Sequence, residues 1–402
     1  MSCNEWKTIK LKDICDYKTG RLNSNAAEEN CIYPFFTCSP EPYRINSYSF
    51  DQDAIILAGN NANGKFHINY YNGKFDAYQR TYIMKTKDND KVDNIYLYYY
   101  LSLQLNYLRE ISVGSATRFL TKTILDDIDI KYPPYNQMKS IGKILRTLDD
   151  KIELNNEMNK TLEEMAQSIF KRWFVDFEFP NEDGKPYKSS GGEMVDSELG
   201  MIPKGWEVKT IDNLCEVGSS KRIFMKEYVD SGVPFYRGKE IIEKSKGNSI
   251  STELFITKER FEEIKEKFGV PNKNDILLTS VGTLGVAYLV DDEEFYFKDG
   301  NLTWFKNFKE EIYRYFIYQW IISSEGKKSI DAITIGSTQK ALTINTLKGM
   351  KLVLPSNDIL SLFEGFIKSN ISNIRSNNEE KNNLIDIRDS LLPKLMSGEI
   401  QI

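Results

Sequence analysis

The segment Val113-Gly-Ser-Ala-Thr-Arg-Phe-Leu-Thr121 recurs 222 residues later as Ile335-Gly-Ser-Thr-Gln-Lys-Ala-Leu-Thr343, and this pair decides the fold. Residues 6–15 and 206–215 are also alike, each running from a Trp to a Cys at an offset of 200. The offset grows along the chain because the second copy carries insertions, which loops tolerate best. The chain of 402 residues is therefore a duplication, with one lobe in each copy.

Each copy combines short apolar runs with a helical stretch. The runs at 53–58, 81–85, 275–279 and 285–290 are bounded by turn-forming residues and are typical of buried strands. Stretches rich in Tyr and Leu at 95–111 and 312–323 favour helices, and the repeated Gly-Ser turn then leads to a last strand. We therefore predict lobes of the α/β class, with an α+β arrangement. The expected boundaries are a first lobe at 1–135, a helix at 136–179, a surface linker at 180–204, a second lobe at 205–356 and a second helix at 357–402.

Two long helices are expected, at about 136–173 and 358–395. In the first, one heptad row contains Ile141, Leu148, Asn155, Leu162 and Ile169, and a second row three residues later contains Ile144, Lys151, Met158 and Met165. This pattern predicts an antiparallel coiled coil, which would give the molecule pseudo-twofold symmetry. Asn155 and Asn377 hold equivalent positions, where they either face each other and fix the register or lie on a solvated edge.

Composition excludes several classes of protein. The net charge of −5 argues against a basic coat that binds nucleic acid indiscriminately, although a local basic groove stays open. Neither a run of about 18 apolar residues nor an apolar N-terminal leader occurs, so no membrane span and no signal peptide are expected. Five cysteines without a CxxC pair predict neither a disulfide framework nor a zinc site, and they indicate the cytoplasm. The single histidine, His67, excludes a His-rich metal site and is expected to be structural.

Three segments imitate catalytic motifs. Residues 59–65 fit GxxxxGK, but Phe66 stands where a phosphate-binding loop needs Ser or Thr for magnesium. The acidic run at 291–294 is expected to be a solvated turn with no pairing partner. Tyr132-Pro-Pro-Tyr135 resembles an amino-methyltransferase loop but lacks its leading amide or acid. No catalytic residue and no metal site is therefore predicted.

The chain resembles the specificity (S) subunits of type I restriction–modification systems. The resemblance rests on Leu145-Arg-Thr-Leu-Asp-Asp-Lys-Ile-Glu-Leu-Asn-Asn156, Ile169-Phe-Lys-Arg-Trp-Phe-Val-Asp-Phe177, Gly200-Met-Ile-Pro-Lys-Gly-Trp-Glu207 and Leu391-Leu-Pro-Lys-Leu-Met-Ser-Gly-Glu-Ile400. It implies two target-recognition domains that each read half of a bipartite double-stranded DNA sequence. It also implies helices that act as a spacer and dock methyltransferase (M) subunits and, through them, restriction (R) subunits. S-adenosylmethionine, ATP and Mg²⁺ would belong to those partners.

The candidate DNA contacts fall into three groups. The Gly-Ser turns come first, because short hydroxyls, an amide and a cation on a tight loop suit phosphate and base edges. The turn residues are Ser115, Thr117 and Arg118, with Ser337, Gln339 and Lys340 in the second copy. The loops after the first buried strands supply Asn60, Asn61, Lys65, Thr279 and Ser280, and a third group contains Gln79, Arg80, Arg237 and Lys239. A capped structural turn and an ordinary solvated surface are the alternatives.

Aromatic residues follow the first helix. Trp173, Phe174 and Phe177 form either a subunit interface or the closure of a core where helix meets lobe. Two other functions remain as alternatives to DNA recognition: a self-contained restriction endonuclease or methyltransferase, and a coiled-coil scaffold that does not bind DNA.

Overall fold

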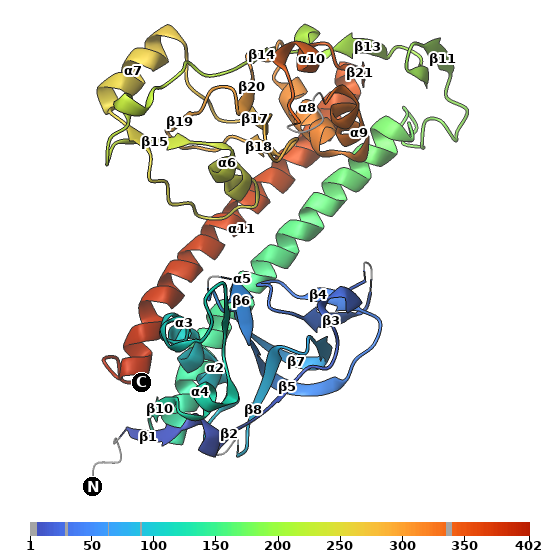
Figure 1. Cartoon of the computed structure of the whole chain (residues 1–402). Helices are drawn as coiled ribbons and strands as arrows, with labels where there is room; N and C mark the ends of the chain where they lie inside the picture. The colour runs from blue at the N-terminus through green and yellow to red at the C-terminus, as the bar shows by residue number, and fades with distance from the viewer. Residues whose placement is uncertain (1–5, 29–30, 63, 89–90, 335–339) are drawn as a thin grey trace. The chain divides into compact units, whose positions relative to one another are not determined.

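The computed structural model describes residues 6–28, 31–62, 64–88, 91–334 and 340–402. These residues form two compact units (Figure 1). The first comprises Met1–Glu153 together with Asn383–Ile402, and the second comprises Leu154–Asn382. Each unit therefore contains one lobe and one end of each long helix.

A six-stranded sheet forms the centre of the first lobe, in the strand order β2-β8-β5-β7-β3-β4. Neighbouring strands are antiparallel except for β3 and β7. The strands of this lobe are β1 (Lys7–Lys10), β2 (Cys15–Thr19), β3 (Tyr33–Phe36), β4 (Tyr43–Ile45), β5 (Phe50–Ala58), β6 (Asn60–Ala62), β7 (Ile68–Ala77), β8 (Thr81–Thr86), β9 (Thr117–Phe119) and β10 (Asp129–Tyr132). Its helices are α1 (Leu11–Ile14), η1 (Ser24–Ala26), α2 (Asn94–Leu103), α3 (Leu105–Ile111) and α4 (Lys122–Asp126).

Strand β5 is buried on both faces of this sheet. Ile55 and Leu57 pack in the cluster that includes Tyr96 of α2, whereas Ala54 and Ile56 belong to a separate cluster on the other face. The alternation follows from the two-residue period of a strand. Each fully buried aliphatic side chain contributes about 1.5–3 kcal/mol to folding. The strand thus anchors the start of the loop that follows it in the core of the lobe.

The second lobe consists of smaller sheets. Its strands are β13 (Glu207–Thr210), β14 (Glu216–Gly218), β15 (Val233–Tyr236), β16 (Phe255–Ile256), β17 (Ile276–Thr279), β18 (Ala287–Leu289), β19 (Tyr296–Phe297), β20 (Leu302–Lys306) and β21 (Lys351–Leu354). Its helices are η3 (Ile211–Asn213), η4 (Met225–Glu227), α6 (Gly238–Ser245), α7 (Lys258–Lys267), α8 (Ile312–Ile322), α9 (Ser324–Ile333) and α10 (Ile344–Lys348). The largest sheet has the order β14-β20-β17-β18.

The second lobe repeats the strand connections of the first, which confirms the duplication. The pair β1–β10 is antiparallel, as is β13–β21. The pair β3–β7 is parallel, as is β15–β19. Strand β5 lies between β8 and β7, and β17 lies between β20 and β18. Helices α6 and α7 occur between β15 and β17, where the first lobe has only β4, and this insertion explains the growing offset.

The predicted elements coincide with observed ones to within a few residues. The runs at 53–58, 81–85 and 275–279 fall in β5, β8 and β17, or extend them by one residue, and 285–290 surrounds β18. The stretch at 95–111 forms two helices instead of one, because the chain breaks at Gln104 between α2 and α3. The stretch at 312–323 corresponds to α8.

The long helices are α5 (Tyr135–Phe170), which continues as a π-helical turn η2 (Lys171–Val175), and α11 (Asn357–Ser397) (Figure 1). Within the second unit, Asn155 donates to Glu380, whereas Phe170 packs on Phe363 with ring centroids 6.0 Å apart. Later residues of α5 therefore contact earlier residues of α11. The helices are antiparallel, as predicted.

The second heptad row of α5 was placed wrongly. Ile141 and Asn155 of the first row are fully buried. The residues that accompany them are Leu145 and Asn159, four positions later, while Met158 is 42% exposed. Positions i and i+4 lie on one face of a helix, so the buried stripe follows that spacing instead of the i+3 row.

The segment between the copies is more ordered than the predicted linker. Strands β11 (Met194–Ser197) and β12 (Gly200–Pro203) form an antiparallel hairpin. Phe179, just before the segment, stacks on Tyr187 within it and on Trp206 after it, with ring centroids 4.6 and 4.7 Å apart. Aromatic stacking thus fixes this segment against the second lobe.

Candidate nucleic-acid interface

In the first lobe, the Gly-Ser turn and the loop after β5 form one structure. Strands β6 and β9 pair antiparallel, which sets Asn61 opposite Arg118. The backbone amide of Leu120 also donates to the carbonyl oxygen of Gly59 at 2.8 Å. Two of the three predicted groups are therefore adjacent, although they are far apart in the sequence.

The turn itself requires glycine. Gly114 has a φ of +105°, and a Cβ at this position would lie 2.1 Å from the carbonyl oxygen of Thr117. Val113 and Phe119 exchange backbone hydrogen bonds across the turn. This closure leaves Ser115 exposed at the tip.

Arg80 of the third group joins the same surface. Its carbonyl oxygen accepts a 2.8 Å hydrogen bond from the backbone amide of Gly59, and its guanidinium lies 5.4 Å from the ring centroid of Phe119. Lys65 is exposed, and its carbonyl oxygen accepts from the side chain of Asn61 at 2.7 Å. Gln79, by contrast, donates to Asn23 at 2.8 Å.

Asn60 is held by another contact in this cluster. The thiol of Cys38 donates to the side-chain oxygen of Asn60 at 2.9 Å. Arg118 donates from Nη1 to the carbonyl oxygen of Ser112 at 3.1 Å. Both side chains remain partly exposed, so they lie at the surface with fixed orientations.

The second lobe repeats the backbone of this arrangement. The amide of Leu342 donates to the carbonyl oxygen of Ser280 at 3.0 Å, as Leu120 does to Gly59. Val281 and Ala341 form the antiparallel bridge that corresponds to β6–β9. Lys340 is exposed, whereas the predicted contacts Ser337 and Gln339 lie outside the described residues.

Thr279 and Ser280, which the sequence predicts as DNA contacts, are buried in this structure. They are 1% and 2% exposed. Thr279 Oγ1 accepts from the amide of Val286 at 2.9 Å, and the Ser280 hydroxyl is 2.7 Å from that of Thr303. These hydroxyls satisfy backbone and side-chain groups of the lobe itself.

Arg237 is also engaged inside the lobe. Its Nη2 lies 2.8 Å from Oε1 of Glu240, at the start of α6. Burial alone would raise the pKa of Glu240, but the hydrogen bonds from Arg237 outweigh it and lower that pKa. Lys239 lies 3.4 Å from the same carboxylate and keeps a 64% exposed side chain. Of this pair, Lys239 is the more exposed, since the Arg237 side chain is 32% exposed.

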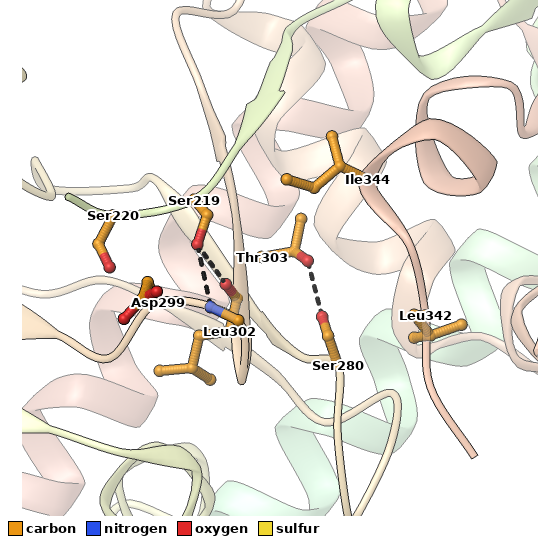
Figure 2. Close-up of a pocket in the computed structure, with 9 residues that line it drawn as sticks. Ser219, Ser220, Ser280, Asp299, Leu302, Thr303, Leu342 and Ile344 are labelled. Atoms are coloured by element: carbon orange, nitrogen blue, oxygen red, sulfur yellow. Dashed lines mark hydrogen bonds between the residues drawn. The ribbon is translucent and has the colours of Figure 1, made fainter. Parts of the chain in front are cut away.

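A cavity of about 260 Å³ lies beside the repeated contact in the second lobe. Its lining is Ser219, Ser220, Ser280, Asp299, Gly300, Leu302, Thr303, Leu342 and Ile344. Figure 2 shows the Ser280 and Thr303 hydroxyls joined by their hydrogen bond. It also shows the Ser219 hydroxyl bonded to backbone atoms of Gly300 and Leu302, where β20 begins. Asp299 pairs with Arg222 at 2.8 Å. The hollow thus combines hydroxyl and carboxylate groups with the aliphatic side chains of Leu302, Leu342 and Ile344.

The two register asparagines are each hydrogen bonded across the helix pair. Asn155 donates to Glu380 Oε2 at 3.0 Å, and Asn377 donates to Asn159 Oδ1 at 2.9 Å. Asn159 in turn donates to Asn378 at 2.8 Å. Asn155 and Asn377 are therefore offset by about one helical turn instead of lying directly opposite each other.

The aromatic residues after α5 pack into the core of the second unit. Phe174 is buried, with its ring 4.7 Å from that of Phe363, which removes it from an exposed docking surface. Trp173 packs on Phe363 at 6.2 Å and Phe177 on Trp206 at 5.7 Å, and both remain partly exposed. Phe174 therefore closes the core where helix meets lobe, whereas Trp173 and Phe177 each keep part of the ring exposed.

The acidic run at 291–294 is paired, contrary to expectation. Asp291 lies 3.2 Å from Arg375, and Glu293 lies 2.7 Å from Lys244. Asp292 and Glu294 pair with Lys273 and Lys265. These ion pairs connect the loop to α6, α7 and α11, so the run is part of the lobe's framework.

His67 precedes β7, and its carbonyl oxygen accepts a 2.9 Å hydrogen bond from the amide of Ala58. Burial, and then the charge of Lys65, lower the pKa of His67. Among the described residues, no group of three or more His, Cys, Asp or Glu side chains is arranged to hold a metal ion. No helix in the described part of the chain has the length and apolar character to cross a membrane.

Sequence reasoning missed Arg109. It lies on α3 and lines a cavity of about 400 Å³ with Asn106, Glu110 and Arg118. A lone arginine near a helix end belongs to no sequence motif. Arg109 is recognised as a candidate only because the structure places it beside Gly64 and Arg118.

Comparisons with known proteins agree with this architecture. The family model "Type I restriction modification DNA specificity domain" matches residues 4–164 and 203–383. The EcoDI specificity subunit of Escherichia coli is 30% identical over 230 residues, which cover 54% of this chain and 50% of that protein. The MjaIX specificity subunit of Methanocaldococcus jannaschii is 29% identical over 318 residues, which cover 78% and 70%.

A solved structure shares the fold. The crystal structure of the type I restriction–modification S subunit from M. genitalium aligns with a TM-score of 0.60 and 16% identity, over 98% of this chain and 96% of that chain. The family model covers most of both copies, including the paired strands and much of both long helices. The chain therefore belongs to the family of DNA specificity subunits of type I restriction–modification systems, in which catalysis and its cofactors reside in the other subunits.

Proposed function

We propose that this chain reads a bipartite double-stranded DNA sequence, one half with each lobe, and directs methylation and cleavage by partner subunits. One observation carries the proposal: the same backbone hydrogen bond, Leu120 to Gly59 and Leu342 to Ser280, occurs beside the loop that follows the buried strand β5 or β17 in each lobe. In the first lobe, Asn61, Lys65 and Arg118 are gathered at this loop. Amides and cations on a tight loop suit base edges and phosphates.

The helix pair would separate the two lobes and dock the methyltransferase subunits, with restriction subunits joining through them. Exposed apolar side chains on α5 support this part of the proposal. Leu154, Met158 and Met165 are 48%, 42% and 44% exposed. Apolar groups left on a helix surface are typical of a protein interface. S-adenosylmethionine, ATP and Mg²⁺ would act in those partners, and the complex would work in the cytoplasm, where it meets host DNA.

The test compares methylation of host DNA with and without this chain. Cells that produce the methyltransferase partner with the chain should carry one bipartite methylated motif, which disappears when the chain is omitted. The purified chain alone should transfer no methyl group and cut no DNA. Methylation by the chain alone would favour a self-contained enzyme. An unchanged methylation pattern, together with no DNA footprint for the assembled complex, would favour a scaffold without DNA binding.

A further inference from the structure

We propose that Arg109 and Arg118 together bind a single phosphate of the DNA backbone. This inference rests on the proposed function and adds a contact that the sequence did not indicate. The two side chains line one cavity of about 400 Å³ with Asn106 and Glu110. Arg109 comes from α3 and Arg118 from β9, so two separate elements supply the two cations.

Gly64 allows the two arginines to converge. A Cβ on Gly64 would lie 3.0 Å from Cγ of Arg109 and 3.0 Å from Cγ of Arg118. Gly64 also has a φ of +68°, a conformation that a side chain disfavours. The glycine therefore provides the backing against which both arginine stems lie. This is the last glycine of the GxxxxGK run.

The two arginines of this cavity form no ion pair with a described carboxylate, although Glu110 also lines it. Across the described residues, no carboxylate lies within 4.0 Å of the guanidinium of Arg109 or Arg118, and Glu110 on the rim pairs with neither. Arg118 uses Nη1 for the carbonyl oxygen of Ser112 and keeps its other donors. Two guanidinium groups at one cavity repel each other unless an anion lies between them.

A phosphate fits this arrangement better than a base edge. A guanine edge offers two neutral acceptors, which one guanidinium saturates in bidentate fashion. A phosphate carries a full charge and several acceptor oxygens, so it can bind two guanidinium groups at once. Asn106 adds an amide donor at the same cavity. The geometry thus assigns Arg118 to the DNA backbone instead of to a guanine.

The site is specific to the first lobe. At the repeat offset of 222, Asp331 replaces Arg109, while Lys340 still corresponds to Arg118. Only one member of the pair is therefore present in the second copy. This difference supplies an internal comparison, because Lys340 should act without an arginine partner on the preceding helix.

The test measures the affinity of the assembled complex for its target duplex as a function of salt. Arg109→Ala, Arg118→Ala and the double variant are compared with Lys12→Ala, which removes an exposed cation on α1. Counterion release depends on the number of phosphates neutralised, at a slope of about 0.9 for each phosphate. Because both arginines neutralise one phosphate, the double variant should reduce the slope by about one and not by two. Arg109→Lys should keep most of the slope, and Lys12→Ala all of it.

A second arm locates the phosphate directly. Duplexes carry a neutral methylphosphonate at one backbone position at a time. Neutralising one position should weaken binding of the unaltered protein, weaken it less in Arg109→Ala and in Arg118→Ala, and have no effect on the double variant. The methylated motif should stay the same in all variants.

Three outcomes would overturn the inference. The first is an unchanged salt slope in a double variant that unfolds at the native temperature. The second is a salt slope reduced by two in the double variant. The third is a relaxed base preference in Arg118→Ala. Each of these leaves sequence-specific binding by the unaltered complex intact. Failure of the proposed function is distinguishable, because the unaltered complex would then show no sequence-specific binding at all.

Discussion

Nη1 of Arg388, on α11, lies 2.7 Å from Oδ1 of Asp149, on α5. The hydroxyl of Tyr99, on α2, donates to the other carboxylate oxygen at 2.5 Å. One carboxylate thus connects both long helices to the first lobe within a single unit. The ion pair is partly buried, with side-chain exposures of 27% and 18%. Such a pair is expected to fix how the first lobe meets the helix ends.

Asp149→Ala should destabilise the first unit. Removing the carboxylate leaves the Arg388 guanidinium and the Tyr99 hydroxyl without this acceptor, at an expected cost of about 1.5–3 kcal/mol. Urea unfolding measures the loss. Asp150→Ala is the matched control, because Asp150 is more exposed and pairs with Arg146 one turn away on the helix surface. Equal losses in the two variants would show that the connection through Asp149 has no special weight.

Lys381 predicts an unusual pH dependence. It is 4% exposed, and burial lowers its pKa below the ordinary 10.5. Its ammonium lies 3.5 Å from the side-chain oxygen of Asn248, a weak contact. Below its folded pKa, Lys381 is therefore a buried charge that the unfolded state solvates. Lys381→Met should raise stability at pH 7 by roughly 1 kcal/mol or more.

The sign of this effect is fixed by the direction of the pKa shift. Because the folded pKa is depressed, the penalty is complete below it and fades as the pH rises toward 10.5. Thermal unfolding of Lys381→Met and of the unaltered chain should therefore converge at alkaline pH. Lys368→Met is the control, since Lys368 is exposed and pairs with Glu364. A constant difference between pH 7 and pH 10.5 would contradict burial of a charged lysine.

Substitutions at Phe174 and Trp173 should have different effects on stability and on partner binding. Phe174→Ala removes a buried ring from the core and should cost about 3–5 kcal/mol. Trp173→Ala should cost less, because the ring is partly exposed, and should weaken association with the methyltransferase subunit if its edge contributes to docking. Calorimetry and co-purification measure the two effects. Weaker destabilisation by Phe174→Ala than by Trp173→Ala would reverse the assignment.

In the polar middle of the helix pair, changing one asparagine alone should cost more stability than changing two bonded asparagines together. Asn159 accepts from Asn377 and donates to Asn378. Asn159→Leu leaves both partners incompletely bonded and should cost about 1–3 kcal/mol. Adding Asn377→Leu should recover part of that loss, because both members of one bond are then apolar. A double-mutant cycle measures the coupling, and strict additivity would argue against a shared role for these amides.

The repeated segments predicted the duplication, the long helices and their direction because these features depend on period and spacing. Side-chain availability was harder to predict. Thr279 and Ser280 follow a buried strand, as Asn60 does, yet they turn inward because Val286 and Thr303 supply partners from elsewhere in the lobe. Hydrogen-bond partners of this kind follow no sequence spacing, so the sequence alone does not predict them.

Arg109 shows the opposite failure. Nothing in the sequence of α3 distinguishes it from any solvated arginine. Its importance arises from Arg118, which lines the same cavity from β9, and from Gly64, against which both arginine stems lie. The row error in α5 has a simpler origin, because heptad patterns at i+3 and i+4 overlap in a short window.

The central claim is that each lobe reads one half of a bipartite target, and exchanging one lobe tests it most directly. Residues 205–356 are replaced by the corresponding segment of a family member with a different target, and methylated bases are mapped across the host genome. The account predicts a methylated motif in which one half is new and the other half is unchanged. A motif changed in both halves, or one changed in neither, would contradict it.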